Sequence, residues 1–198
     1  MTEGGLTSSE GARDYGRGLL LGRAVRLRPL AEDDLPHLDR WWRETEWQPL
    51  QQPTVRPRPA GTAADLFRAW SANTDPGAVG LSVETLEDRR LVGHVTLHGA
   101  TLPQRTGTLG IILGPEHTGH GYGSDAVRVL LRYAFQEMNL HRVELSVWGF
   151  NTDARRAYER CGFVVEGRRR EAVFHAGRYH DDVVMGVLAS EWNATGPS

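Results

Sequence analysis

The fold is decided by residues 109–138, LGIILGPEHTGHGYGSDAVRVLLRYAFQEM. This stretch predicts a strand, a turn rich in glycine and then a long amphipathic helix. Gly119, Gly121 and Gly123 alternate just before the helix, so several backbone N–H groups can face one bound anion. Each glycine costs roughly 0.5–1 kcal/mol relative to alanine in a regular element. We therefore predict a site where an anionic ligand comes close to the backbone.

The composition limits the classes of protein that the chain can belong to. With 198 residues and 39% hydrophobic residues, we expect one domain with a real core. A net charge of −2 argues against a nucleic-acid partner. The single cysteine, Cys161, excludes an internal disulfide framework and cysteine-cluster metal sites. No apolar run reaches the length of a signal peptide or a membrane span, so we expect a cytoplasmic protein without membrane contact.

The domain organisation follows from patterning along the chain. Residues 1–22 are rich in glycine, serine and charge and predict a loosely ordered arm. Residues 23–192 form the single predicted domain, and 193–198 a frayed tail. Four prolines favour a loop over 48–59. Before the glycine turn, hydrophobic spacing predicts helices over 32–43 and 63–72 and strands over 25–28, 81–86, 91–97 and 106–113.

After the glycine turn, the pattern changes to alternating strands and helices. The main helix carries a core stripe of Val127, Leu130, Leu131, Ala134, Phe135 and Met138. Residues 142–147 predict a strand, and Asn151 can cap a helix that ends near Cys161, where Gly162 follows. Residues 164–174 and 178–188 flank His175-Ala176-Gly177 and predict a hairpin. The whole pattern predicts an α+β fold.

Two common phosphate-binding motifs fit the glycine turn poorly. A P-loop requires lysine and then serine or threonine, but His120 and Gly121 stand at those positions. Residues 121–126 match the dinucleotide fingerprint, with Glu144 near the distance of a ribose contact. That fingerprint normally opens a series of parallel strand–helix units, whereas this turn follows an antiparallel meander. Both motifs are therefore disfavoured.

A third motif matches better. Residues 118–123, TGHGYG, resemble the acetyl-CoA-binding signature Q/R-x-x-G-x-G/A of the GNAT superfamily of N-acyltransferases, and residues 151–163, NTDARRAYERCGF, are similar to its second signature. Thr118 departs from the usual glutamine or arginine. LRPL at 27–30, LRYAF at 131–135 and HRVE at 141–144 resemble the branch of ribosomal-protein N-terminal acetyltransferases. The resemblance covers roughly residues 25–192.

The resemblance implies a fold and a set of cofactor contacts. It implies a mainly antiparallel, twisted mixed sheet of about seven strands with helices on both faces, and acetyl-CoA as co-substrate. The pantetheine arm would pair with the strand at Ile111, Ile112 and Leu113, held apart from the strand at 145–147. Asn151 would clamp that arm, or serve only as a helix cap. The pyrophosphate would lie on the backbone of Thr118, Gly119, His120, Gly121, Tyr122, Gly123 and Ser124.

Tyr158 is the predicted catalytic residue. The family places a tyrosine four residues before the glycine that stands here at Gly162. A leaving thiolate has a pKa near 8.5, and a phenol with a pKa near 10 can protonate it or donate a hydrogen bond to it. A helical tyrosine can also be simply buried, with its hydroxyl satisfied.

No residue is an obvious general base. The candidates are Glu84, His98, His175, Asp181 and Asp182, each of which also has a structural interpretation. At pH 7, deprotonating an α-amine costs about 1 kcal/mol, whereas a lysine-type amine costs about 4.6 kcal/mol. The lack of an obvious base therefore favours an α-amine, or another amine of low pKa, as the acceptor.

Other conspicuous residues have ordinary explanations. His117 and His120 lie in the turn without a third ligand in view, so we predict no metal site. Arg168-Arg169-Arg170 suggests a solvated strand edge, or a contact to the CoA 3′-phosphate or to an acidic partner. The early aromatic and acidic residues could border the acceptor pocket or pack in the core. They are Trp41, Trp42, Trp47, Trp70, Asp39, Glu44 and Glu46.

These inferences together predict an N-acetyltransferase that moves an acetyl group from acetyl-CoA to a primary amine. A protein N-terminal α-amine is the first expectation for the acceptor. The alternatives are a small amine, such as an aminoglycoside or polyamine, and a non-catalytic acyl-CoA-binding sensor. A homodimer is expected from the family resemblance.

Overall fold

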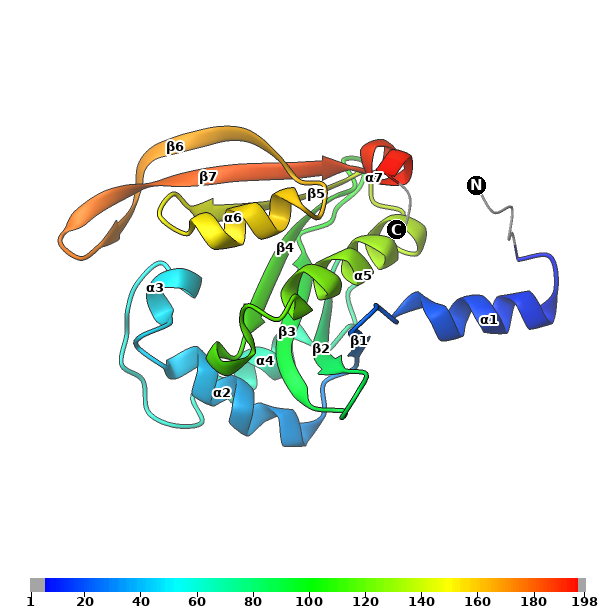
Figure 1. Cartoon of the computed structure of the whole chain (residues 1–198), viewed down its shortest axis with the longest axis horizontal. Helices are drawn as coiled ribbons and strands as arrows, with labels where there is room; N and C mark the ends of the chain where they lie inside the picture. The colour runs from blue at the N-terminus through cyan, green and yellow to red at the C-terminus, as the bar shows by residue number, and fades with distance from the viewer. Residues whose placement is uncertain (1–5, 196–198) are drawn as a thin grey trace.

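A seven-stranded mixed sheet organises the computed structural model, which describes residues 6–195 (Figure 1). Neighbouring strands are antiparallel except β4 and β5, which are parallel. The strand order is β1-β2-β3-β4-β5-β7-β6, with β1 (Val25–Arg28), β2 (Val79–Thr85), β3 (Leu91–His98), β4 (Thr106–Leu113), β5 (Arg142–Trp148), β6 (Val164–His175) and β7 (Arg178–Leu188). The sheet confirms the predicted α+β fold.

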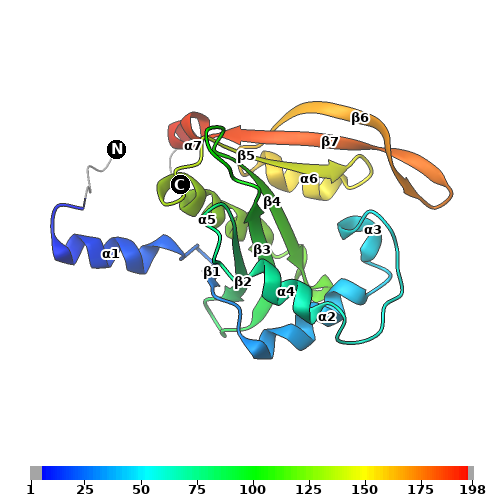
Figure 2. The same ribbon diagram turned by 180° about the vertical axis from the view of Figure 1, so that it is seen from behind.

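Helices cover both faces of this sheet, as predicted. Helices α5 and α6 lie on the face turned to the viewer in Figure 1, and α4 lies on the opposite face, seen in Figure 2. Single 3₁₀ turns occur at Glu32–Asp34 and Pro115–His117. The helices are α1 (Ser9–Leu19), α2 (Leu35–Arg43), α3 (Gln48–Gln51), α4 (Ala64–Trp70), α5 (Tyr122–Gln136), α6 (Thr152–Glu159) and α7 (Ala189–Thr195).

Two apolar clusters hold these layers together. Leu130, Leu131 and Ala134 of α5 are fully buried in the larger cluster, which confirms most of the predicted core stripe. On the other face, Leu38 and Phe67 belong to a smaller cluster made mainly by α2 and α4. Burying one such large side chain contributes roughly 1.5–3 kcal/mol. The second cluster therefore fixes α2 and α4 beside the sheet.

Strands β4 and β5 pair for only a short distance. Their parallel register covers Thr106–Thr108 opposite Arg142–Glu144. Beyond that point β4 continues to Leu113 and β5 to Trp148 without further pairing between them. The two strands therefore leave a gap in the centre of the sheet, in agreement with the separation that the family resemblance implies.

The predicted N-terminal arm is wrong in one respect, because it contains helix α1. The Ser8 side chain caps this helix by accepting a hydrogen bond from the Gly11 N–H at 3.0 Å. At its other end, the Arg132 guanidinium donates to the carbonyls of Gly18 and Leu19. The Gly18 carbonyl also accepts from the Leu21 N–H at 3.1 Å, whereas Arg132 is a distant partner. The partner lies more than a hundred residues away in sequence, so composition alone could not reveal it.

Two further boundaries differ from the predictions. The predicted loop over 48–59 begins with one helical turn, α3. The predicted frayed tail overlaps α7, which ends at Thr195, while residues 1–5 and 196–198 lie outside the described part of the chain. In the described range 6–195, no helix has the length and apolar character needed to cross a membrane.

Candidate active site

The glycine turn before α5 has the geometry of an anion-binding loop. Gly119 and Gly121 have φ angles of 78° and 81°, in the left-handed region that favours glycine. A Cβ atom at either position would meet open space, so the outer side of the turn is free of protein atoms. Gly123 instead packs closely, since its Cβ would lie 2.9 Å from Leu113 Cδ1. Two glycines therefore shape the turn, and the third allows close packing.

Backbone N–H groups in this turn are available for a ligand. The Thr118 N–H donates to Pro115 O, and the Asp125 N–H donates to Gly121 O. Between these bonds, the N–H groups of residues 119–124 have no partner in the part of the chain that the structure describes. The turn lies at the positive end of the 15-residue helix α5. It can therefore hold a phosphate without a glutamine or arginine at position 118.

One edge of β4 is free where it leaves β5. Residues Ile111 and Ile112 pair with β3 on one side only, opposite Val95 and His94. Alternate backbone groups of β4 therefore face the gap and can pair with an extended ligand that contains amides. Leu113 packs under Gly123 and joins this edge to the glycine turn.

A pocket of about 500 Å³ continues from this gap. It brings together residues from α2, α3, α4, β3, β4, β5 and α6, which are far apart in the sequence. The lining is formed by Trp42, Leu50, Gln51, Ala69, Trp70, Ala78, His94, Thr96, Leu97, His98, Leu109, Gly110, Ile111, Ile112, Ser146, Val147, Trp148, Asn151, Ala154 and Tyr158. The pocket thus unites the predicted catalytic tyrosine with the free edge of β4.

Tyr158 lines the pocket from α6. Its ring packs edge-on against Phe163, with 5.9 Å between ring centroids. Burial raises the pKa of the Tyr158 phenol to about 12, so the hydroxyl keeps its proton at neutral pH. A protonated phenol in this pocket can donate to a thiolate that forms beside it.

Asn151 has the capping role that the sequence allowed. Its side-chain oxygen accepts a hydrogen bond from the Ala154 N–H at 3.2 Å and so begins helix α6. Asn151 also lines the pocket, where its side-chain NH₂ group can still donate to a ligand.

The candidate general bases are not equivalent. Only His98 of these five lines the pocket. The Glu84 carboxylate is buried and accepts from Arg26 and Arg28, and although burial would raise its pKa, these hydrogen bonds lower the pKa. Glu84 is therefore part of an ion-pair network and is not free to take a proton.

The other three candidates lie at the β6–β7 hairpin. The His175 ring is within 3.2 Å of Gln52 O, and Asp181 accepts from the Glu171 N–H. Asp182 is buried, with one carboxylate oxygen 3.4 Å from Arg169 and the other without a partner among the described residues. Asp182 lies directly opposite Trp148 in the pairing of β5 with β7.

The early aromatic residues divide between the core and the pocket. Trp42 and Trp70 line the pocket and pack edge-on at 5.4 Å. Trp41 is buried, and its indole N–H donates to Glu116. Asp39 is buried too and accepts from the N–H groups of Gly61 and Ala63, so it is structural. Trp47, Glu44 and Glu46 are not among the lining residues.

Among the lining residues that sequence reasoning missed are His94 and Trp148. The His94 Nε2 atom lies 2.7 Å from the Ser71 hydroxyl, and burial lowers the pKa of His94 to about 4, against a smaller opposing effect of Asp34. His94 is therefore neutral at pH 7. The polar histidine at an inward-facing strand position was the available signal for this residue.

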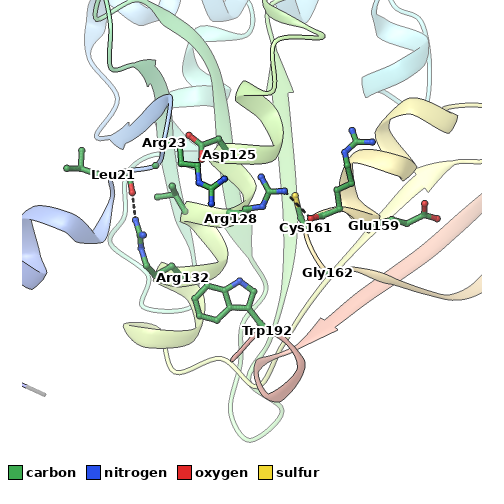
Figure 3. Close-up of a pocket in the computed structure, with 12 residues that line it drawn as sticks. Leu21, Arg23, Asp125, Arg128, Arg132, Glu159, Cys161, Gly162 and Trp192 are labelled. Atoms are coloured by element: carbon green, nitrogen blue, oxygen red, sulfur yellow. Dashed lines mark hydrogen bonds between the residues drawn. The ribbon is translucent and has the colours of Figure 1, made fainter. Parts of the chain in front are cut away.

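A second pocket, of about 470 Å³, lies along the outer side of α5 (Figure 3). Arg23, Arg128 and Arg160 line it, and the Arg128 guanidinium donates to Arg160 O. The buried Cys161 thiol donates to Ser124 O and joins this pocket to the first turn of α5. The cationic pocket therefore adjoins the glycine turn.

The remaining conspicuous residues have structural contacts. His117 packs edge-on against Trp41, and His120 stacks on Tyr122. In residues 6–195, no three histidine, cysteine or acidic side chains gather in a way that could hold a metal ion. Arg168 and Arg169 pair with Asp181 and Asp182 along the exposed strand β6.

Comparison with known proteins identifies the family. The model of the acetyltransferase (GNAT) domain matches residues 24–164. The chain belongs to the GNAT acetyltransferase family. Enzymes of this family take the acetyl group from acetyl-CoA. The match also agrees with the resemblance that the sequence motifs carry.

Individual relatives carry different names. The chain is 38% identical over 104 residues to spermidine N(1)-acetyltransferase of Vibrio cholerae and 34% identical over 113 residues to "Putative ribosomal N-acetyltransferase YdaF" of Bacillus subtilis. These matches cover 52% and 57% of this chain, and the chain spans only 60% and 62% of the two relatives. The crystal structure of the Vibrio enzyme in complex with CoA and spermine has a TM-score of 0.75 and 28% identity, over 85% of this chain and 98% of that one.

Proposed function

We propose that this protein is an acetyl-CoA-dependent N-acetyltransferase that acetylates a primary amine. The observation that carries the proposal is the pocket in which Tyr158 and the free edge of β4 meet, next to the glycine turn. The N–H groups of residues 119–124 would hold the pyrophosphate. The backbone at Ile111 and Ile112 would pair with the pantetheine amides, and the Asn151 side chain would donate to the same arm.

Tyr158 would act on the leaving group. A neutral amine attacks the thioester carbonyl, the carbon–sulfur bond breaks, and the thiolate takes a proton from the Tyr158 hydroxyl. The proton released by the amine passes to water or to a basic group of the pocket, and solvent returns a proton to the Tyr158 phenolate before the next cycle. Because the pKa of Tyr158 is raised to about 12, the phenol is fully protonated before the reaction.

The cationic pocket beside α5 would serve the other end of CoA. Arg128 and Arg160 stand beside the first turn of α5, and neither has a carboxylate partner among the described residues. Guanidinium groups bind phosphate strongly. These arginines would therefore contact the CoA 3′-phosphate, in place of the Arg168–Arg170 run, whose first two members pair with aspartates.

The acceptor has two candidates. The names of several relatives, and the neighbour structure with spermine, favour a small amine such as a polyamine. A protein N-terminal α-amine has support from the ribosomal relative and from its low cost of deprotonation at neutral pH. Both acceptors undergo the same transfer reaction.

Self-association is also expected. Strand β6 forms one edge of the sheet, and the large apolar side chains Val164, Phe174 and Tyr179 of the β6–β7 hairpin are more than half exposed. A relative from Vibrio cholerae is described as dodecameric. Light scattering after size-exclusion chromatography will give the mass of the assembly, and a mass equal to that of one chain would contradict this expectation.

Free thiol released from acetyl-CoA tests the proposed activity. The purified protein is mixed with acetyl-CoA and a panel of primary amines, and acetyl-CoA binding is measured in parallel by calorimetry. We expect binding, together with thiol release that depends on at least one amine. Binding without release for every amine would identify an acyl-CoA sensor, and absence of binding would reject the proposed site.

A further inference from the structure

The pocket around Tyr158 offers no negative side chain to an amine. Among the described residues that line it there is no aspartate, glutamate, lysine or arginine. Its ionisable side chains are Tyr158, His94 and His98. Burial raises the pKa of Tyr158 to about 12 and lowers the pKa of His94 to about 4, so both are neutral at pH 7. A histidine such as His98 can add only a positive charge.

Carboxylates on neighbouring elements already have arginine partners. Asp181 and Asp182 of β7 pair with Arg168 and Arg169, and neither aspartate lines the pocket. The pantetheine arm that would share the pocket is uncharged as well. Burying an ammonium group without a counter-ion is costly, and the cost rises with each further charge. A polyamine would therefore enter this pocket with several unpaired charges.

One wall of the pocket is aromatic. It consists of Trp42 of α2 and Trp70 of α4, which both line the pocket and pack edge-on with 5.4 Å between ring centroids. The fully buried Phe67 packs edge-on against Trp42 at 5.9 Å and against Trp70 at 5.4 Å. Trp70 nevertheless exposes 37% of its surface. This aromatic wall is therefore fixed by packing and still presents indole surface to a ligand.

The aromatic wall and Tyr158 lie on opposite faces of the sheet. On β3, Val95 and Leu97 belong to the larger apolar cluster, and Tyr158 packs against the same cluster. Since side chains alternate along a strand, His94 faces the other way. Its ring packs edge-on against Phe67 of α4 at 5.3 Å, in agreement with this direction. The pocket therefore reaches both faces, with the phenol at one end and the aromatic wall at the other.

We infer that the acceptor is a primary amine with a single positive charge and an aromatic ring a few atoms from the nitrogen. The ring packs against Trp42 and Trp70, while the nitrogen reaches the thioester. A tryptophan face can hold one ammonium group, but a polyamine brings several. The inference rests on the proposed acetyl transfer and names the acceptor class for it. The same chemistry occurs in a free arylalkylamine and at the amino end of a peptide that begins with phenylalanine.

Four amines test this inference with the full chain. 2-Phenylethylamine and a phenylalanine-initiated hexapeptide carry the ring, n-butylamine is the matched amine without it, and spermidine is the polyamine. Thiol release is measured at saturating acetyl-CoA, and kcat/KM is expressed per neutral amine. We expect at least one ring-bearing amine to exceed both n-butylamine and spermidine about tenfold or more. Whichever of 2-phenylethylamine and the hexapeptide reacts faster identifies the source of the ring.

A preference for spermidine, or n-butylamine as fast as the ring-bearing amines, would overturn the inference while acetyl transfer stands. No release with any amine of the wider panel would instead reject the proposed function.

An added carboxylate tests the charge argument. Ser146 of β5 lines the pocket and is exposed, so Ser146→Asp places a negative charge there. The ratio of kcat/KM for spermidine to that for 2-phenylethylamine should rise about fivefold or more, because the further ammonium groups gain a counter-ion. Ser146→Asn, of the same size without the charge, and Ser190→Asp, which adds the charge outside the pocket lining, should move this ratio less than about twofold. An unchanged ratio in Ser146→Asp would overturn the charge argument.

A spectroscopic measurement keeps the test independent of the variants' folding. In wild-type protein labelled with ¹⁵N-tryptophan and saturated with CoA, the faster of the two ring-bearing amines should shift the indole N–H signals of Trp42 and Trp70. The signal of Trp192, which lines the other pocket, should stay in place. Unchanged signals for Trp42 and Trp70 at a saturating concentration of this amine would overturn the inference.

Discussion

The cofactor side and the acceptor side of the site are built in different ways. The cofactor side uses backbone groups: the N–H groups of the turn before α5 and the free edge of β4. The acceptor side uses side chains from α2, α3, α4, β3 and β5, including Trp42, His94 and Trp148. A backbone site requires only that the chain adopt a certain turn, whereas a side-chain site requires distant segments to meet. The first therefore leaves a sequence motif, and the second does not.

The largest effect is expected where the two sides meet, at Tyr158. Tyr158→Phe removes the hydroxyl and should lower kcat by roughly ten- to ten-thousandfold, because the thiolate loses its proton donor. The dissociation constant of acetyl-CoA, measured by calorimetry, should stay within about twofold. An unchanged kcat would exclude Tyr158 from the mechanism.

The next largest effect is expected at Asp34, which holds helix α2 of the acceptor side to the sheet. Asp34 is buried at the start of α2, accepts from Arg28, Ser82 and the Ala31 N–H, and joins α2 to β1 and β2. Asp34→Asn should lower the free energy of unfolding by roughly 3 kcal/mol at pH 7, measured by urea denaturation. The exposed Asp65, which pairs with Arg68, supplies the control Asp65→Asn, with almost no expected loss.

The stability lost in Asp34→Asn should depend on pH, and the direction of the Asp34 pKa shift determines how. Burial alone would raise the pKa of Asp34, but its hydrogen bonds outweigh burial and lower the pKa. The carboxylate therefore contributes stability above its unfolded pKa, near 3.9, and loses it as the pH falls through the lower folded pKa. The difference between wild type and Asp34→Asn should shrink below about pH 4. A constant difference down to acid pH would contradict this linkage.

A smaller effect is expected in the cofactor turn. Alanine at Gly121, where φ is 81°, costs roughly 1–2 kcal/mol and tilts the N–H groups of the turn. Gly121→Ala should raise KM for acetyl-CoA about tenfold and leave KM for the amine unchanged. Gly177→Ala, at φ 77° in the hairpin turn, is the control for strain alone. If both variants raised KM equally, backbone strain would account for the effect, and loss of the N–H contacts of the glycine turn would not.

The smallest effect concerns the cationic pocket beside α5. Arg128→Ala and Arg160→Ala should each raise KM for acetyl-CoA about three- to fivefold, because an exposed guanidinium–phosphate contact is partly screened by water. With 3′-dephospho-acetyl-CoA, both variants should behave like wild type. A similar loss with both forms of the cofactor would place the 3′-phosphate elsewhere.

The same contrast explains what the sequence could predict. Strand β4, the glycine turn and α5 are local patterns, so their order and nearly their boundaries were predicted, as was the Asn151 cap. Helix α1 was missed because its last carbonyls bind Arg132, a distant residue. Trp148 was missed because its place in the pocket depends on where β5 separates from β4. Hydrophobic periodicity contains no information on that separation.

The candidate bases show this limit most clearly. From the sequence, Glu84 and His98 were equal candidates. The structure separates them, because Glu84 bonds to arginines while His98 lines the pocket. The sequence shows that a carboxylate and an imidazole lie on neighbouring strands, but it does not show which groups they contact. Their partners, which decide whether they can take a proton, are set by the register of the sheet.

The fate of the acetyl group tests the central claim most directly. The protein is incubated with acetyl-CoA labelled with ¹³C in the acetyl group and with the best amine of the panel, and the products are separated by mass. Direct attack in the pocket predicts that the label appears on the amine nitrogen, with one free CoA for each acetylated amine. Label released as acetate, or CoA released without acetylated amine, would contradict the account.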